Sequence, residues 1–135
     1  MNSFTPTDIR LHKKSAILEL GFADGSNFQL SAEFLRVHSP SAEVRGHGRG
    51  QEVLQTGKRD VKLNAIEAVG NYAIKLDFDD GHNTGIYSWD YLHHLSVNQD
   101  KLWRQYLDKL RDARASRSPL PPDTQVVRIR PASKE

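Results

Sequence analysis

A glycine-rich segment with basic side chains is the part of this sequence best suited to binding chemistry. In residues 45–50, Arg45, His47 and Arg49 each precede a glycine. Glycines let successive backbone N–H groups point at one spot, and guanidinium groups add positive charge, so the pattern suits an anion or a carboxylate. Such residues are also typical of solvated loops, and both interpretations stay open. If the loop folds over the preceding segment to accept an anion, the binding residues are Arg36, Ser39, Ser41, Arg45, His47 and Arg49.

The histidines are the second group with potential chemistry, because the chain has six of them and no cysteine. Without thiolates it can form no disulfide, no cysteine nucleophile and no cysteine-ligated zinc or iron–sulfur site. No two histidines are four residues apart, so only the fold could gather His38, His47 and His82 into a zinc or iron site. A lone histidine beside a turn more commonly forms local hydrogen bonds, and His82 directly follows an Asp-Gly pair.

Motifs for the common catalytic chemistries are missing from the sequence. It contains no P-loop, no G-x-G-x-x-G context and no Ser-His-Asp order. Asp79 and Asp80 are adjacent, and in a hairpin at least one of them should face solvent. They are therefore poor candidates for a pair of carboxylates in acid–base catalysis. We therefore predict that the chain is not an enzyme and has no catalytic residues.

The charges divide between a neutral body and a basic tail. Four of the 19 basic residues and two of the 17 acidic residues follow residue 114, so residues 1–114 contain fifteen of each. Nucleic-acid binding usually needs a concentrated basic face, so we expect no nucleic-acid partner.

No apolar run approaches the roughly 20 residues that cross a bilayer, and residues 1–10 lack a signal-peptide pattern. We expect a cytoplasmic protein with no membrane partner.

These side chains must be positioned by short strands and turns. Apolar residues alternate with polar ones in several segments, as in strands with one buried face. Asp24-Gly25 and Asp80-Gly81 predict tight hairpin turns, because glycine accepts the positive φ that such turns need. Residues 39–59 form a long predicted loop, a kind of segment that often carries function. The predicted strands are residues 9–12, 17–22, 28–30, 61–69, 72–78 and 85–87.

Three helices complete the predicted domain. Ser31 can cap a helix at residues 32–37, a second covers 88–95, and Ser96 with Gln99 has capping-box spacing for a final helix. The final helix ends near residue 115 and has an apolar stripe typical of packing against a core. We predict an α+β domain at residues 1–114, with mostly antiparallel β-sheet hairpins in two layers, short helices and a C-terminal amphipathic helix. A Pro-rich flexible tail follows at residues 115–135.

The two halves of the predicted domain share a pattern. The alternating apolar residues and Asp-Gly pair of residues 18–25 match those of 74–81, and after one inserted residue 30–35 matches 87–92. Each half predicts a strand, a turn, a second strand and a short helix. Internal duplication and convergent hairpin chemistry both explain the match.

The most distinctive stretches are residues 34–44, FLRVHSPSAEV, and 78–82, FDDGH, with VGNYA at 69–73 and YSW at 87–89. Together they resemble the DUF971 family of small bacterial proteins, which is similar to the N-terminal domain of γ-butyrobetaine hydroxylase. The resemblance covers residues 5–112.

In the hydroxylases the domain holds a structural zinc through C-x-C-x-x-C and a later histidine. The resemblance places Ser39, Ser41 and Val44 at the cysteine positions and His82 at the histidine. Neutral hydroxyls are poor zinc ligands and valine is none, so we expect the zinc to be lost.

The resemblance also bears on function. The oxygenase chemistry of the hydroxylases lies in a separate C-terminal barrel with a two-His, one-carboxylate iron site. No histidine here has an acidic residue two positions later, as such a site usually has. The family domain also occurs fused to Mrp-type P-loop proteins that carry iron–sulfur clusters, which implies an accessory role.

Three functions follow as hypotheses. The first is a noncatalytic binding or accessory module that docks a protein partner. The alternative is a metal-binding protein that uses His82 and its neighbours, with zinc or iron, and is linked to iron or iron–sulfur handling. The third is a weak RNA binder that uses the glycine–arginine loop.

Overall fold

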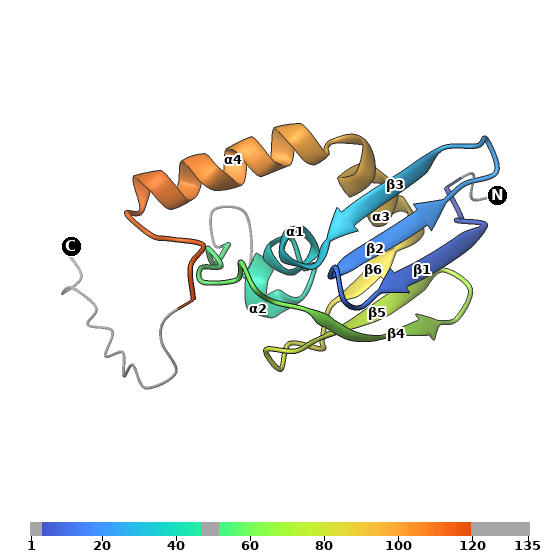
Figure 1. Cartoon of the computed structure of the whole chain (residues 1–135), viewed down its shortest axis with the longest axis horizontal. Coiled ribbons are helices and arrows are strands. Elements are labelled where there is room, and N and C mark those ends of the chain that lie inside the picture. Colours follow the sequence, from blue (N-terminus) through green and yellow to red (C-terminus); the bar gives the residue numbers. More distant parts are fainter. Residues whose placement is uncertain (1–3, 47–51, 120–135) are drawn as a thin grey trace.

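The structure is a computed structural model that describes residues 4–46 and 52–119. Its elements follow one another as two β-β-β-α units, with a short helix between the units and a long helix at the end (Figure 1). The elements are β1 (Asp8–His12), β2 (Ile17–Gly21), β3 (Asn27–Ser31), α1 (Ala32–Val37), α2 (Ala42–Arg45), β4 (Leu63–Val69), β5 (Ala73–Phe78), β6 (Ile86–Ser88), α3 (Trp89–Val97) and α4 (Gln99–Asp112).

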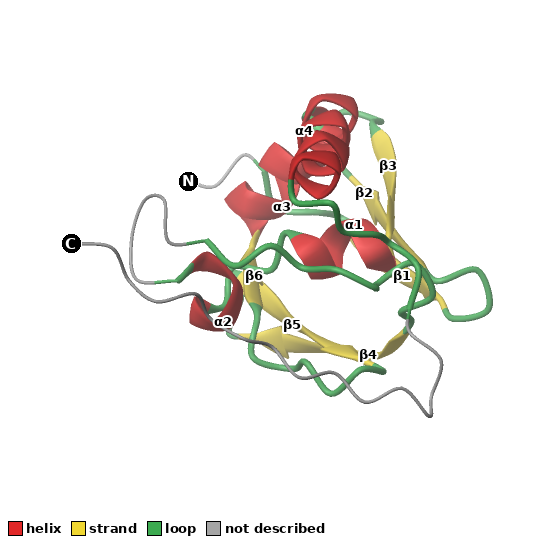
Figure 2. Cartoon of the chain, turned by 90° about the vertical axis from the view of Figure 1, so that its left-hand side faces the viewer, coloured by secondary structure: helices red, strands yellow, loops and turns green. Residues whose placement is uncertain are grey.

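The strands form two antiparallel sheets, β1-β2-β3 and β4-β5-β6. In the first, Leu18 lies opposite Leu11 on one side and Leu30 on the other; in the second, Leu76 lies opposite Ile66. The sheets approach each other at β1 and β4, and α1 and α3 lie on the inner side of the angle between them (Figure 2). The predicted α+β class with antiparallel hairpins and a C-terminal helix is confirmed.

Both predicted Asp-Gly turns are present, and the two units are built alike. Gly25 has φ +88° and Gly81 has φ +89°, values that an L side chain rarely adopts. Each unit then ends in a helix capped by a serine: the Phe34 N–H donates to Ser31 Oγ at 3.0 Å, and the Tyr91 N–H donates to Ser88 Oγ at 3.1 Å. The repeated sequence pattern therefore corresponds to a repeated local structure.

The core fills the space between the sheets and the helices. Its fully buried side chains come from both units and include Leu18, Leu20, Leu30, Leu35, Leu76 and Leu92. Tyr106 and Leu110 of α4 form a smaller buried cluster with Val37, as the predicted apolar stripe of this helix requires. None of the helices in the described part of the chain is long and apolar enough to cross a membrane.

Two local predictions were wrong. The predicted loop contains the one-turn helix α2, which begins after Ser41, whose Oγ accepts from the Glu43 N–H at 3.2 Å. The predicted capping box of α4 does not form, because Ser96 is still inside α3 and donates its hydroxyl to the Leu92 carbonyl at 2.7 Å. Helix α4 begins at Gln99 without a side-chain cap.

The residues that follow α4 lie against the domain. The N–H groups of Gly57 and Arg59 donate to the carbonyls of Ser116 and Arg117, both at 2.9 Å. The Arg117 guanidinium donates two hydrogen bonds, of 2.8 and 2.7 Å, to the buried carboxylate of Glu33. Residues 115–117 are therefore attached to α1 and to the 57–59 segment. The predicted domain boundary after residue 114 and the flexible tail stay predictions.

Candidate functional site

The side chains of Ser39 and His82 form a hydrogen bond, although 43 residues separate them in the sequence. Ser39 follows α1, and His82 follows the Asp80-Gly81 turn. Their Oγ and Nε2 atoms share a buried hydrogen bond of 2.8 Å, and Ser39 Oγ also accepts from the Ser41 N–H at 3.2 Å. The fold thus joins two of the segments that the sequence singled out, and it joins them through hydrogen bonds.

Ser41 extends the same network towards the surface. Its hydroxyl lies 2.8 Å from the hydroxyl of Thr84, which in turn donates a short hydrogen bond to the Glu43 carboxylate. That carboxylate is also 3.9 Å from His82 Nδ1. We call these five residues, Ser39, Ser41, Glu43, His82 and Thr84, the polar network. Every polar side chain in it has a partner within the domain.

The electrostatics of the polar network keep His82 neutral near neutral pH. Burial lowers the pKa of the His82 imidazole, and the positive charge of Arg36 lowers it further; Glu43 and Asp80 oppose these effects but do not outweigh them. The hydrogen bond from Thr84 lowers the pKa of the exposed Glu43 carboxyl. The network therefore contains a neutral imidazole beside an ionised carboxylate.

The chemistry of the polar network does not fit the zinc that the resemblance implies. At the four positions the side chains are two neutral hydroxyls, one buried valine and one imidazole whose Nε2 is already hydrogen-bonded. Zinc sites require thiolate, imidazole or carboxylate ligands, usually four of them. In residues 4–46 and 52–119, no group of three or more such side chains could hold a metal ion. Hydrogen bonds join the segments that a metal would otherwise join.

Gly85 makes this close packing feasible, a role that no sequence pattern indicated. A Cβ at this position would lie 2.5 Å from Ser39 Oγ and 3.1 Å from a ring carbon of Tyr87. The buried Tyr87 hydroxyl donates to the Leu35 carbonyl at 2.6 Å. Because only glycine lacks a side chain, Gly85 lets the chain pass directly over the serine.

Arg36 and Asp80 form an ion pair at the base of the polar network. Arg36 Nε lies 2.8 Å from Asp80 Oδ2, and Arg36 Nη1 donates to Gln55 Oε1 at 3.0 Å. Lys58 also donates to Asp80, and the His82 N–H donates to Asp80 Oδ1 at 3.2 Å. Burial raises the pKa of the Asp80 carboxyl, but Lys58 and Arg36 outweigh it and the pKa is lowered.

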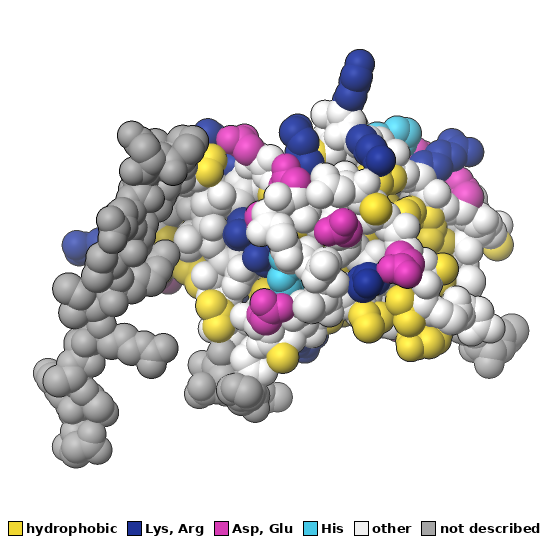
Figure 3. Space-filling model, turned by 90° about the horizontal axis from the view of Figure 1, so that it is seen from below, with side chains coloured by type: hydrophobic (Ala, Val, Ile, Leu, Met, Phe, Trp, Pro, Cys, Tyr) yellow, Lys and Arg dark blue, Asp and Glu magenta, His cyan; other side chains and the backbone are white. Residues whose placement is uncertain are grey.

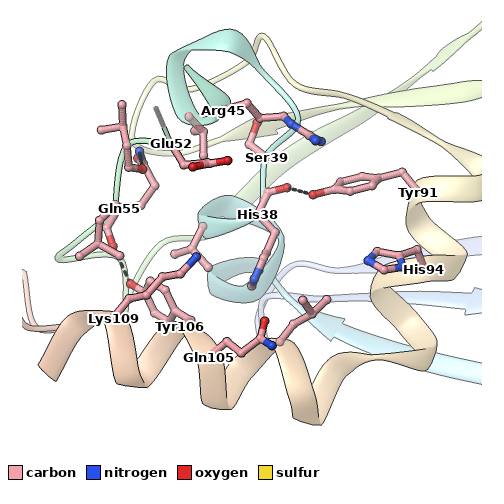
Figure 4. A pocket seen from close by; sticks show the side chains of 15 residues that line it. His38, Ser39, Arg45, Glu52, Gln55, Tyr91, His94, Gln105, Tyr106 and Lys109 are labelled. Atoms are coloured by element: carbon pink, nitrogen blue, oxygen red, sulfur yellow. Dashed lines mark hydrogen bonds between the residues drawn. The ribbon is translucent and has the colours of Figure 1, made fainter. Parts of the chain in front are cut away.

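Ser39 also lines an open pocket of about 400 Å³. The pocket is bounded by the end of α1, by α2, by the 52–55 segment, and by α3 and α4 (Figure 4). Its volume lies within the range of ligand pockets, roughly 300–1,000 Å³. The apolar part of its wall consists of Val37, Val44, Val53, Leu54 and Leu102.

Polar side chains enter this pocket from several elements. Arg45 of α2 and Lys109 of α4 come from different sides, and His38 lies between them (Figure 4). The Arg45 guanidinium lies 5.8 Å from the ring centre of Tyr91, within the range of a cation–π contact. The Tyr91 hydroxyl donates to the His38 carbonyl at 2.6 Å, so this aromatic wall is fixed in place.

His38 presents a hydrogen-bond acceptor in this pocket. Its Nδ1 lies 2.8 Å from the Phe34 carbonyl, which can only accept, so Nδ1 carries the proton and Nε2 keeps its lone pair. Burial lowers the pKa of this imidazole, and the nearby positive charge of Lys109 adds to the effect, against the Phe34 hydrogen bond. The ring is therefore neutral at neutral pH.

The structure separates the residues that the sequence grouped as one site. His38, Ser39 and Arg45 line the pocket, whereas Ser41 and His82 belong to the polar network. Arg36, expected to bind an anion, is buried and paired with Asp80 instead. His47 and Arg49 lie outside the described residues. In the described part of the chain, His38 and His82 do not come together as metal ligands.

Several residues of the site were not predicted from the sequence. Lys109, Tyr91 and Tyr106 reach the pocket from the last two helices, in which no binding residue was predicted. Glu43 and Thr84 complete the polar network. Lys109 lies near the end of the amphipathic stripe of its helix, and this position was the available sign of a binding role. The sequence does not show which other segments would lie opposite it.

The charges on the lower face of the molecule are mixed. In Figure 3, basic and acidic side chains alternate over this face and no broad area carries a single sign. Nucleic-acid binding depends on concentrated positive charge, so this face gives no support to the RNA hypothesis.

Fold and site together define a small α+β domain of two β-β-β-α units, with a closed polar network and an adjacent open pocket. The chain belongs to the family described as "Gamma-butyrobetaine hydroxylase-like, N-terminal", whose family model matches residues 9–93. This confirms the family resemblance. No curated protein matches the chain.

Solved structures support the same assignment. Two solution NMR structures are similar to this chain: one is 49% identical, with a TM-score of 0.75, over 90% of this chain and 95% of the other. The second is 53% identical, with a TM-score of 0.73, over 96% and 98% of the two chains. A crystal structure of a protein of unknown function from Acidithiobacillus ferrooxidans, of the DUF971 family, is 37% identical, with a TM-score of 0.60, over 71% and 98%.

Proposed function

We propose that this protein is a noncatalytic binding module that docks a protein partner through the pocket between α2 and α4. One observation carries the proposal: the pocket combines an apolar wall, two fixed tyrosines and two cationic side chains in an opening of about 400 Å³. Tyrosine and arginine are enriched where protein interfaces gain most of their binding energy.

The surroundings of the pocket favour a partner that extends beyond it. Val53 lines the pocket and is 52% exposed, so apolar surface continues from the interior to the outside. The Tyr106 hydroxyl donates to the Gln55 carbonyl at 2.7 Å and holds this wall against α4. A wall fixed in this way loses little conformational freedom when a partner binds.

The His82 imidazole is poorly placed for general-base catalysis, which supports a noncatalytic function. A general base needs an accessible nitrogen or carboxylate within hydrogen-bond reach of a substrate. His82 is 6% exposed and its Nε2 is hydrogen-bonded to Ser39. We infer that the network holds α2 and the 82–85 segment together and thereby shapes the pocket wall that contains Arg45.

The family description agrees with an accessory module. It names an N-terminal part of a longer protein, and a domain that is joined to another domain in some proteins can meet a separate partner in others. We infer docking for the present chain on this basis.

The experiment is a capture of partners from native extract with the full chain and two matched variants. Val53→Asp places a charge in the pocket, and Val97→Asp places the same charge at an equally exposed valine, 53% against 52%, outside the pocket lining. We expect a partner to be retained by the wild type and by Val97→Asp and lost by Val53→Asp. Equal retention by both variants would overturn docking at this pocket.

A further inference from the structure

We propose that the pocket recognises an acidic peptide segment of the partner, in which an apolar side chain enters the pocket and a neighbouring Asp or Glu lies between Arg45 and Lys109. The proposal rests on the proposed function and adds the chemistry of the occupant.

The charges of the pocket are complementary to an acidic segment. Arg45 and Lys109 both line the pocket, and neither forms an ion pair with another described residue. In contrast, Arg36 and Arg117 are both paired with carboxylates of the domain. Glu52 is the only acidic residue among the described side chains that line the pocket. The body of the protein is neutral, so this excess of positive charge is local to the pocket.

The hydrogen-bond donors and acceptors of the pocket suit a peptide. Two cations suit a carboxylate, and a guanidinium can bind it through two hydrogen bonds at once. His38 Nε2 is an acceptor and suits a backbone N–H. A peptide carries both groups beside each other, since an acidic side chain is attached to a backbone that donates.

The apolar wall of the pocket suits an apolar side chain beside the acidic one. Val37, Val44 and Leu102 line the pocket together with the ring of Tyr91. They can remove one apolar side chain from water, which contributes most of the energy of such contacts. A purely acidic ligand would leave this wall exposed, so the sequence recognised should contain an apolar residue next to the acid.

The test is a selection from a random heptapeptide display library on the immobilised full chain. We expect the wild type to enrich peptides with Asp or Glu next to an apolar residue. The double variant Arg45→Glu/Lys109→Glu should lose these peptides and enrich Lys or Arg in their place, because the charge preference of the pocket is inverted. Both side chains are exposed, and an unchanged Tm will show that the variant is folded.

A synthetic peptide from the selection then provides affinities by fluorescence anisotropy. Lys109→Ala should weaken the Kd about fivefold or more, and added salt should weaken it further. The matched control is Lys101→Ala, which removes the same charge from the same helix outside the pocket and should leave the Kd unchanged. Equal effects of the two variants would overturn the proposal.

The outcomes also separate this proposal from the proposed function. Enrichment of apolar peptides without an acidic residue, lost on Val53→Asp, would overturn the acidic segment and leave docking at the pocket in place. Peptides that bind Val53→Asp and wild type equally would overturn both.

Discussion

The polar network and the pocket both include Ser39, yet the polar side chains of the two regions differ in burial and in pairing. In the network, Ser39, Ser41 and His82 are buried and each is hydrogen-bonded within the domain. In the pocket, Arg45 and Lys109 are exposed and have no acidic partner among the described residues. Buried polar groups cost free energy unless they are paired, whereas exposed ones are free to bind. The comparison indicates which side chains hold the fold and which can meet a ligand.

The largest expected effect comes from breaking the ion pair at the base of the network. Asp80→Ala leaves the buried Arg36 guanidinium without its carboxylate, and such a change costs about 3–5 kcal/mol of unfolding free energy. The measurement is urea unfolding followed by circular dichroism. The control is Asp24→Ala in the equivalent turn, where the exposed carboxylate accepts from the N–H and the hydroxyl of Ser26. We expect a much smaller loss there, and equal losses would contradict the assignment.

The second prediction restores metal ligands to the network. In the triple variant Ser39→Cys, Ser41→Cys, Val44→Cys, three thiolates would lie near His82, a donor set that suits zinc. Free zinc at a hundredfold excess over its Kd should stabilise this variant by about 2.7 kcal/mol. Wild-type protein should show no rise in Tm with zinc or iron. A rise in the wild type would favour the metal-binding hypothesis, and no rise in the variant would show that the four positions do not converge.

The third prediction concerns close packing at Gly85. Gly85→Ala should cost about 1–3 kcal/mol, because the new methyl group meets Ser39 Oγ. Ser39→Ala should also cost about 1–3 kcal/mol, because it leaves His82 Nε2 without a partner. In the double variant the contact is relieved, so we expect less than the sum of the two losses. Additive losses in a double-mutant cycle would contradict this contact.

The fourth prediction is a loss of stability at mildly acidic pH. The pKa values of His38 and His82 are lowered in the folded protein, mainly by burial, so the unfolded chain binds protons first as the pH falls. Stability is then fully present above the ordinary histidine pKa of about 6.5 and declines as the pH falls from there towards the folded pKa values. Tm measured between pH 8 and pH 5, about the range where histidine titrates, should decrease. His82→Gln should flatten this decrease, and an unchanged profile would contradict the role of His82.

The smallest effect on stability is expected in the pocket. Arg45→Ala and Lys109→Ala should each change the unfolding free energy by no more than about 0.5 kcal/mol, because exposed side chains without buried partners contribute little. Urea unfolding provides the measurement. A larger loss would mean that these side chains support the fold, and the contrast between network and pocket would be weaker.

The sequence determined most of the local structure. Ser31 caps its helix and both Asp-Gly pairs form hairpin turns, as predicted. Ser88, which was predicted to lie inside the second helix, caps that helix instead. These features depend on backbone conformation and hydrogen bonds within a few residues, which explains why the sequence alone indicates them. The capping box at Ser96 failed because the preceding helix continues through that serine.

Tertiary structure decided the site. Asp24 and Asp80 stand in equivalent turns, but only Asp80 is paired with an arginine 44 residues away. His82 meets Ser39 across 43 residues, and the pocket takes its wall from α1, α2, α3 and α4. Such contacts depend on how two similar units pack together, and local sequence patterns do not predict that arrangement. The sequence therefore determined the units, and the packing of the units decided which polar side chains are paired and which remain open to a partner.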